Sequence, residues 1–432
     1  MSIGVISITL LGLLLLLLGS TIWVGVSLFV VGIISIILFT NNPPLTILSN
    51  MLWNNTNSAT MFALPLFILM GEILVRSRLS ESLFKGLAPW MSFLPGRLLH
   101  VNIIASSLFS AVSGSSAATT ATVGKIALPE LIKRNYSRSL SIGSLAGAGT
   151  LGFLIPPSMM MIVYGIVADV SIGRLFIAGI IPGIILAAGF SGYIVLRCLF
   201  NPSLAKGDEK YSWSDRIKAL PQLLPIILLI ILVLGSIYTG WATPTEAAAV
   251  GVLGSFIIAL FSKTLNRKVF KEIILGSVKT STMIMLIVCG ASYLSVTVGY
   301  LKIPAQLTAF IGSLGLTGFQ LILILSIMYI ILGMMLDGFS IIVMSLPLAL
   351  PLIVAAGFDP LWFGIYLVLM IEISQITPPV GFNLFVINGL VKDDVLKIAY
   401  YAIPSFIIIL LVTGVITVYP EIVLWFPEMM MK

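Results

Sequence analysis

Residues 101–132 read VNIIASSLFSAVSGSSAATTATVGKIALPELI, an apolar block with a polar, small-residue break at Ser113-Gly-Ser-Ser116. The block is long enough to cross the hydrocarbon core of a membrane, but the break opposes a continuous span. Basic residues flank it on both sides, Arg97 before it and Lys133 and Arg134 after it. If both flanks face the cytoplasm, the block enters and leaves on one side. We therefore predict a re-entrant helical hairpin, because non-helical backbone at that depth survives only where protein or a wet cavity surrounds it.

The composition identifies the class of protein. Of the 432 residues, 59% are hydrophobic and only 9% are charged, and the mean hydropathy is +1.15. A soluble domain carries about 25% charged residues, so a soluble enzyme of this size would lack the polar surface it needs. The net charge of +7 comes from basic residues strung between apolar runs, not gathered on one face, which excludes a nucleic-acid binder. These values indicate a polytopic membrane protein.

Few side chains suit enzymatic chemistry or transition-metal binding. The chain has one histidine, His100, and two cysteines, Cys198 and Cys289, both in apolar surroundings. They supply neither a disulfide framework nor a thiolate or histidine metal cage. An intramembrane hydrolase would need a nucleophile paired with a base at one depth, and the sequence carries no motif for such a pair. We therefore expect no enzymatic activity.

Apolar runs between charged residues predict further membrane segments, since a helix needs roughly 20 apolar residues to span. The segments are 3–19, 22–40, 52–75, 140–168, 175–200, 220–239, 243–262, 273–299, 360–390 and 398–419. The first run has no Lys or Arg before it, which favours a retained helix over a cleaved signal. A second broken block, 317–354, is interrupted at Asp337-Gly-Phe-Ser340.

The distribution of basic residues favours re-entrant blocks over full spans. If the N-terminus is outside and both broken blocks are re-entrant, most of the 23 basic residues fall on the cytoplasmic side, as the positive-inside rule requires. Full spans would instead place the basic cluster at 133–138 outside. Under this assignment 101–132 opens from the inner face of the membrane and 317–354 from the outer face.

An internal repeat is found when the sequence is shifted so that Ala127-Leu-Pro129 coincides with Ala349-Leu-Pro351. The same shift, which we call the repeat offset, places Pro156-Pro157 on Pro378-Pro379. Because the first half starts outside and the second inside, the two copies have opposite topology, which is typical of secondary transporters. The predicted boundaries are 1–199 for the first inverted repeat, with an inner hairpin at 101–132 and a broken helix at 140–168; 200–219 for a cytoplasmic linker; and 220–432 for the second repeat, with an outer hairpin at 317–354 and a broken helix at 360–390.

Each half places a hairpin tip and a proline-containing break where a binding site can form. Glycine permits sharp turns, and proline leaves carbonyls of the preceding turn without N–H partners. Free carbonyls and Ser/Thr hydroxyls suit a hard cation such as Na⁺, while the N-termini of the following half-helices favour an anion. A carboxylate substrate between two Na⁺ sites is the simplest cargo for this arrangement. The alternative is that these small residues only allow close helix packing.

Two acidic residues in apolar surroundings need separate interpretation, because ionisable groups there are costly. Asp337, at the second tip, either balances the charge of a cation or caps the helix that follows it, and the two roles are compatible. Glu372, before the second break, either supports the loop or relays a proton, of which support is the preferred interpretation.

Three stretches are similar to one family of transport proteins. They read SGSSAATTATVGKIALPELIKRNYSRSLSIGSLAGAGTLGFLIPPSMMMIVYG, GWATPTEAAAVGV, and LDGFSIIVMSLPLALPL followed by ISQITPPVGFNLFVING. Over essentially the whole chain they resemble the large membrane (M) subunit of tripartite ATP-independent periplasmic (TRAP) transporters. The resemblance implies an elevator-type fold like that of the ion-transporter superfamily, and a sodium-driven importer in the bacterial inner membrane. It also implies a separate small membrane subunit of four helices, a periplasmic substrate-binding protein, and an organic-acid substrate such as sialic acid or a dicarboxylate.

The same resemblance implies which residues bind the ions and the substrate, with Na⁺ as the coupling ion and no organic cofactor. The first Na⁺ site would use Ser113, Ser115, Ser116, Gly149 and Gly152. The second would use Asp337, Gly338, Ser340, Thr377 and Pro378. Substrate would contact Ser116, Thr119, Thr150 and Asn383. An alternative function is a stand-alone dicarboxylate or citrate-type symporter or exchanger that works without a binding protein.

Overall fold

The computed structural model describes residues 3–77, 79–205 and 211–430, and these form helices joined by short connections. Within these ranges the only β-type pairing is an isolated bridge between Tyr136 and Ala205. The helices of the first half are α1 (Ile3–Gly19), α2 (Val24–Phe39), α3 (Pro44–Thr56), η1 (Ala59–Phe62), α4 (Ala63–Val75), α5 (Leu79–Met91), α6 (Leu99–Ser113), α7 (Ser116–Lys133), α8 (Arg138–Thr150), α9 (Met159–Ala168), α10 (Ile172–Phe200) and η2 (Pro202–Leu204).

The second half is also helical throughout its described residues. Its helices are α11 (Trp213–Tyr238), α12 (Pro244–Phe261), α13 (Arg267–Tyr300), α14 (Ile303–Ser313), α15 (Gly318–Gly333), α16 (Gly338–Ala355), α17 (Pro360–Gln375), α18 (Phe382–Val391), α19 (Val395–Val418) and α20 (Glu421–Met430). The prediction of an all-α chain is confirmed. The helices with both the length and the apolarity to cross a membrane are α10, α11, α12, α13, α16 and α19.

Helix boundaries in the two halves recur at the repeat offset. α16 both begins and ends where this offset places α7, and α17 begins where it places α8. The residues that cap these helices correspond as well, since Ser115 precedes α7 where Asp337 precedes α16. The Pro156-Pro157 and Pro378-Pro379 bonds, which the same offset superimposes, are both cis. The repeated motifs therefore produce repeated local structure.

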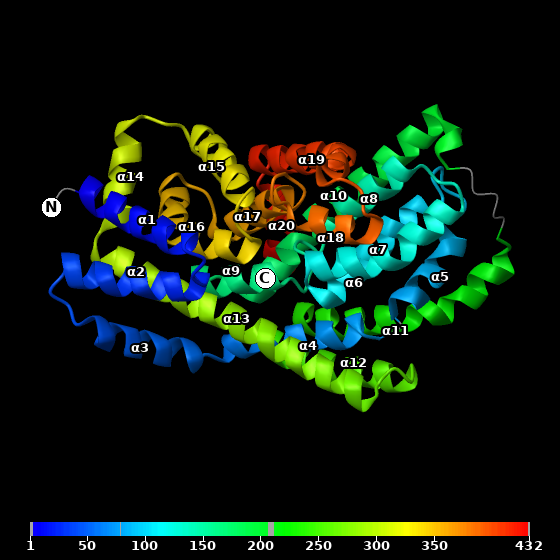
Figure 1. The fold of residues 1–432 in the computed structure, drawn as a ribbon, viewed down its shortest axis with the longest axis horizontal. Helices are drawn as coiled ribbons and strands as arrows, with labels where there is room; N and C mark the ends of the chain where they lie inside the picture. Colours follow the sequence, from blue (N-terminus) through cyan, green and yellow to red (C-terminus); the bar gives the residue numbers. More distant parts are fainter. Residues whose placement is uncertain (1–2, 78, 206–210, 431–432) are drawn as a thin grey trace.

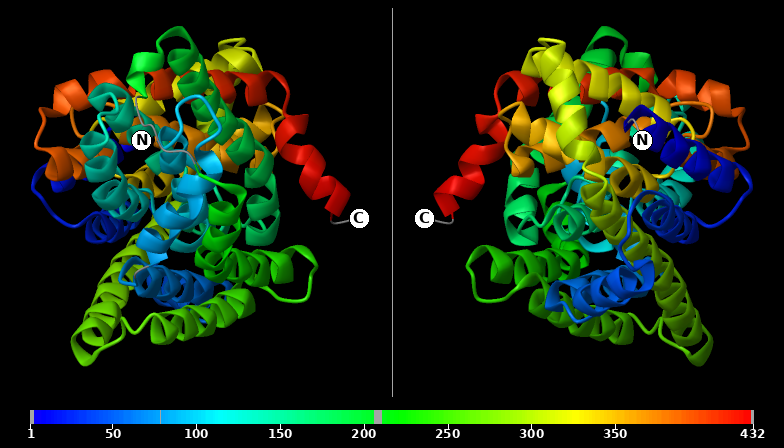
Figure 2. Two further views of the ribbon diagram at one scale, coloured as in Figure 1. Left: turned by 90° about the vertical axis from the view of Figure 1, so that its right-hand side faces the viewer. Right: turned by 90° about the vertical axis from the view of Figure 1, so that its left-hand side faces the viewer.

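Most of the helices form two groups, which we name the scaffold layer (α2–α4 and α11–α13) and the central block (α6–α10 and α15–α19). In the scaffold layer α13 packs against α2 and α4, and α12 packs against α4 and α11. This layer lies along the lower side of Figure 1, and both views of Figure 2 place α12 and α13 there as well. The central block lies above it. This division keeps the helices that carry the tips and breaks together.

The centre of the block is formed by the two helices that lead into the breaks. Every residue of α8 from Leu140 to Thr150 is buried, and so is every residue of α17 from Leu361 to Gln375. A helix is buried all round when each of its sides meets another helix. α7 and α19 cover α8, while α15, α16 and α10 cover α17. The ends of α8 and α17 are thereby held deep inside the protein.

Two predicted segments differ from the structure. The segment predicted as one span at 52–75 is a pair of helices, α3 and η1–α4, bent by 64°, because the polar run Asn54-Asn-Thr-Asn-Ser58 interrupts the apolar pattern. The predicted linker 200–219 is shorter than expected, since Ser212 caps α11, which begins at Trp213. Ser212 and Asp215 form a capping box there. Residues 206–210 of that linker lie outside the described residues.

Candidate functional site

The first hairpin turns at a tip of two residues between α6 and α7. Gly114 has φ +59, a left-handed conformation that glycine adopts without strain. The Ser115 hydroxyl accepts a hydrogen bond from Ala118 N at 3.4 Å and so caps α7. The Ser113 and Thr119 hydroxyls lie 3.0 Å apart, and Ser110 Oγ is 3.5 Å from the same Thr119 oxygen. The Thr119 hydroxyl thus faces α6 across the hairpin.

The first break lies directly against this tip. Between the end of α8 and the start of α9, Ser158 caps α9 by accepting from Met161 N at 3.3 Å. Met159 N donates to the Gly114 carbonyl at 3.3 Å. A Cβ on Gly152 would lie 2.6 Å from Ser116 N, a distance that real side chains do not reach. Glycine at 152 therefore permits the break to touch the tip.

Gly149, in the last turn of α8, allows a second close approach. A Cβ at this position would lie 1.9 Å from the Thr120 hydroxyl oxygen on α7. That oxygen is buried and has no hydrogen-bond partner among the described residues. Of the residues predicted for the first Na⁺ site, the structure brings Gly152 to the Ser115–Ser116 backbone and Gly149 to Thr120.

One residue of the second half reaches the first tip. Asn383, in the first turn of α18, donates from Nδ2 to the Ser116 hydroxyl at 2.7 Å. Both side chains are fully buried. The Asn383 Oδ1 atom has no partner within the described part of the chain. The N-termini of α7 and α18 therefore meet at two of the predicted substrate residues, with an amide oxygen left available.

The second tip is built around a carboxylate. Asp337 accepts from Phe339 N at 3.0 Å and from Ser340 N at 3.3 Å, and the Ser340 hydroxyl also donates to it. The geometry is that of an N-cap, one of the two roles predicted for Asp337, and the side chain remains exposed. A Cβ on Gly338 would meet Met160 and Ile371 at 2.8 and 2.6 Å. This tip thus contacts both α9 and α17.

The second break is held by hydrogen bonds within its own segment. The Thr377 hydroxyl donates to the Ile373 carbonyl at 2.7 Å, and Gly381 N donates to the Thr377 carbonyl at 3.1 Å. Within residues 3–77, 79–205 and 211–430, no hydrogen bond connects Asp337 or Ser340 with Thr377. The structure therefore brings Ser115, Ser116 and Gly152 into contact at the first tip. Of the residues predicted for the second Na⁺ site, Asp337 and Ser340 are hydrogen-bonded to each other, and Thr377 is bonded within its own segment.

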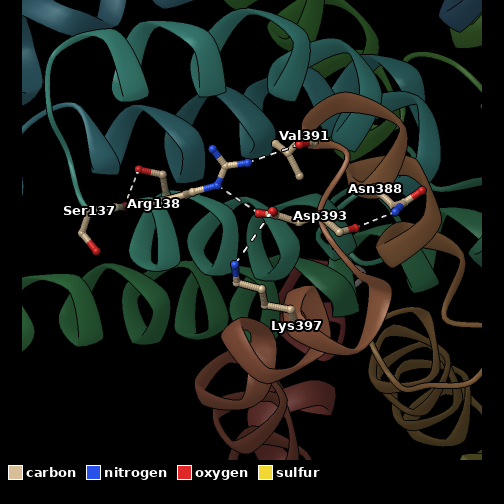
Figure 3. A network of polar contacts seen from close by, with 7 residues as sticks. Ser137, Arg138, Asn388, Val391, Asp393 and Lys397 are labelled. Atoms are coloured by element: carbon tan, nitrogen blue, oxygen red, sulfur yellow. Dashed lines mark hydrogen bonds and ion pairs between the residues drawn. The ribbon is translucent and has the colours of Figure 1, made fainter.

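An ion-pair network that the sequence did not indicate ties the two halves of the block together. Arg138, at the start of α8, donates to the Asp393 carboxylate at 2.9 Å and to the Val391 carbonyl at 3.2 Å (Figure 3). Lys397 Nζ lies 3.9 Å from the same carboxylate. Asn388 Nδ2 donates to the Asp393 carbonyl at 2.6 Å. The network fixes the loop between α18 and α19 against α8, although no local pattern relates residues so far apart in sequence.

Removing this network should lower stability modestly. Hydrogen bonding from Arg138 holds the pKa of Asp393 below its ordinary value, so its contribution is present at neutral pH and is lost as the pH falls through that lowered pKa. The Arg138 side chain is 46% exposed, so we expect a coupling free energy of only about 0.5 kcal/mol between Arg138→Ala and Asp393→Ala. A double-mutant cycle of thermal unfolding in detergent measures it. Strictly additive effects of the two substitutions would contradict the pairing.

Two cavities lie where the scaffold layer meets the central block. One of about 510 Å³ is bordered by residues 54–61 and 243–245 on the scaffold side and by the α9–α10 connection at 165–173. The other, about 660 Å³, lies between α6 and α10 of the block and Ile230, Leu234 and Tyr238 of α11. Both cavities are open to the surface between the two parts.

Comparison with known proteins agrees with this architecture. The family model described as "Tripartite ATP-independent periplasmic transporter, DctM component" matches residues 10–422. A C4-dicarboxylate TRAP transporter large permease protein of Pseudomonas aeruginosa is 32% identical over 400 residues, 92% of each chain. A sialic acid TRAP transporter large permease protein of Vibrio cholerae is 28% identical over 409 residues, 94% of this chain and 95% of that one.

A solved structure shares the fold. The YdaH transporter of Alcanivorax borkumensis superimposes with a TM-score of 0.61 over 87% of both chains, at 14% sequence identity. The proteins matched by sequence are transporter permeases and not enzymes, as predicted. The family model covers nearly the whole chain, so this protein belongs to the DctM-component family of tripartite ATP-independent periplasmic transporters.

Proposed function

We propose that this chain is the large subunit of a sodium-coupled importer for a small organic acid in the bacterial inner membrane. A periplasmic binding protein delivers the acid, and a separate small membrane subunit braces the scaffold layer. The names of the relatives support a carboxylate cargo, since both C4-dicarboxylates and sialic acid carry carboxylate groups. The sequence distribution of basic residues supports a multi-pass arrangement.

The observation that carries this proposal is the contact of Asn383 with Ser116. It joins the N-termini of α18 and α7, and helix N-termini carry partial positive charge and free N–H groups that favour an anion. The segment that follows α8 also lies against Ser116, with Gly152 at the tip. Carbonyls at an interrupted helix end are suited to a hard cation. A carboxylate and a Na⁺ ion placed on the two sides of Ser116 would each favour the binding of the other.

The cavities at the boundary support movement of the central block against the scaffold layer. At about 510 and 660 Å³, they leave space between the two parts into which side chains can move when one part slides past the other. The central block is itself cross-linked by the Asn383–Ser116 and Arg138–Asp393 contacts. We infer that it moves as one body and carries the site across the membrane in an elevator mechanism.

Uptake into proteoliposomes tests the proposed function. With the small subunit in the membrane and the binding protein loaded with labelled organic acid, an inward Na⁺ gradient should drive accumulation. Replacement of Na⁺ by choline should abolish it, and omission of the binding protein should do the same. Accumulation that persists in choline would contradict the sodium coupling, and full uptake without the binding protein would instead favour a stand-alone symporter.

A further inference from the structure

Glu372 is a buried carboxyl group that the proposed site does not use. It lies on α17, one turn before the helix ends, and its exposed fraction is 0%. Both carboxylate oxygens lack a hydrogen-bond partner among the described residues. An uncompensated charge at such a place is costly, and an ionisable group inside a membrane protein is a functional candidate for that reason. The charge of the Glu372 carboxyl group must therefore be neutralised while α17 stays packed.

The polar side chain beside Glu372 cannot neutralise it. The Thr150 hydroxyl faces the carboxyl group, but its proton is already donated to the Gly147 carbonyl at 2.8 Å. The single hydroxyl proton of Thr150 cannot serve both the Gly147 carbonyl and the carboxyl group, so both carboxylate oxygens remain without a partner in the described residues. Two hydrogen-bond acceptors that face each other in a dry interior repel, unless a proton or a metal cation lies between them.

The two residues occupy equivalent positions in the internal repeat, since the repeat offset places Thr150 of α8 on Glu372 of α17. Contact between equivalent residues places them where the two copies meet, and inverted-repeat transporters bind their ions at that interface. Thr150 is also the last residue of α8, where carbonyls lose their helical partners. The pair thus lies at the centre of the block, next to the first break.

Positive side chains on the helices around α17 lie away from this position. Arg138 begins α8 and Lys397 begins α19, and both are engaged by Asp393. Arg174 and Arg197 lie in the first and last turns of α10. Tyr164 of α9 donates to the Pro360 carbonyl, at the opposite end of α17. Within the described part of the chain, no ion pair or titratable partner reaches Glu372.

We propose that the Glu372 carboxyl group and the Thr150 hydroxyl hold one monovalent cation, Na⁺ or a proton, that is carried with the substrate. This site is separate from the two tips and adds one positive charge to each transport cycle. It assigns Thr150 to the cation instead of to the substrate. The inference rests on the proposed function, because it concerns the ions that accompany transport.

Glu372→Gln tests the inference, since glutamine keeps the shape of the side chain and cannot carry the charge. In proteoliposomes containing the full complex, the coupling ratio is obtained from the membrane potential at which net substrate flux vanishes. The variant should move one positive charge fewer per substrate. If the cation is Na⁺, labelled Na⁺ uptake per substrate falls by one; if it is a proton, the substrate-dependent acidification of the lumen disappears. Glu421→Gln, which changes an exposed residue in the first turn of α20, is the matched control.

If the Glu372→Gln variant does not transport, thermal stability provides a second test of the inference. The melting temperature of the purified complex is recorded against Na⁺ concentration at constant ionic strength, and against pH. With Na⁺ at this site, Glu372→Gln should lower the steepness of the Na⁺ dependence. With a proton there, the wild type should lose stability as the pH rises and the proton leaves, whereas the variant should not.

Identical coupling ratios, or identical Na⁺ and pH dependences, in wild type and Glu372→Gln would overturn the inference. That outcome would leave the proposed function intact, provided that the wild type still requires Na⁺. Failure of the wild type to respond to Na⁺ would instead count against the proposed function.

Discussion

Gly152→Ala is expected to reduce sodium-dependent uptake roughly 5- to 150-fold. The added methyl group would lie 2.6 Å from Ser116 N and 2.7 Å from both the Ser115 carbonyl carbon and Ser116 Cα, so the tip must move away from the break. Forcing an extra carbon into such a contact costs about 1–3 kcal/mol, and 1.4 kcal/mol corresponds to a factor of ten in an equilibrium constant. Because backbone is the obstacle, no side-chain rotation relieves the clash. Initial uptake rates at several Na⁺ concentrations give the measurement.

The matched control for this substitution is Gly192→Ala. Gly192 lies within α10, and a Cβ there would meet nothing within 4 Å. Alanine favours the helix more than glycine does, so this variant should transport normally and be no less stable. A fully active Gly152→Ala protein would show that the contact between tip and break has no role in transport.

Asn383→Ala is expected to weaken substrate binding about 10–100-fold, with a smaller change in the Na⁺ concentration required. The substitution removes the donor to Ser116 and the available Oδ1 atom, and leaves the buried Ser116 hydroxyl without its partner. A buried polar group that loses its partner costs about 1–3 kcal/mol. The substrate concentration that gives half-maximal uptake is the quantity to compare, alongside the half-maximal Na⁺ concentration.

Asn388→Ala is the control on the same helix. Asn388 donates to the Asp393 carbonyl, outside the site, at 2.6 Å. Loss of this hydrogen bond should lower the stability of the protein without changing the half-maximal substrate concentration. Equal effects of the two asparagine substitutions on substrate affinity would contradict the assignment of Asn383 to the substrate.

Sequence reasoning located the interruptions because their causes are local. Glycine and proline act on the backbone of their own turn, so Gly114 and the Pro156-Pro157 pair identify non-helical positions without knowledge of the fold. The internal repeat predicted which segments of the two halves are built alike, and α7 and α16 have matching bounds. The bend within 44–75 was not predicted, because a hydropathy pattern indicates the length and apolar composition of a segment but not the direction of its helix axis.

The contacts that complete the site could not be predicted in the same way. The Asn383–Ser116 bond joins residues 267 positions apart, and the Arg138–Asp393 pair joins residues 255 positions apart. The direction of a hydroxyl also depends on its neighbours. Thr119 pairs with Ser113 inside the hairpin, and Thr150 donates to its own helix. Residue type indicated the chemistry at these positions, but the packing of helices decides which atoms each side chain faces.

A density map of the purified complex with Na⁺ and its bound acid tests the central claim most directly. We expect an ion beside Gly149, Gly152 and the 115–116 backbone, and the carboxylate of the acid between Ser116 and Asn383. A substrate bound on the scaffold layer, or an unbroken helix through residues 113–116, would contradict it.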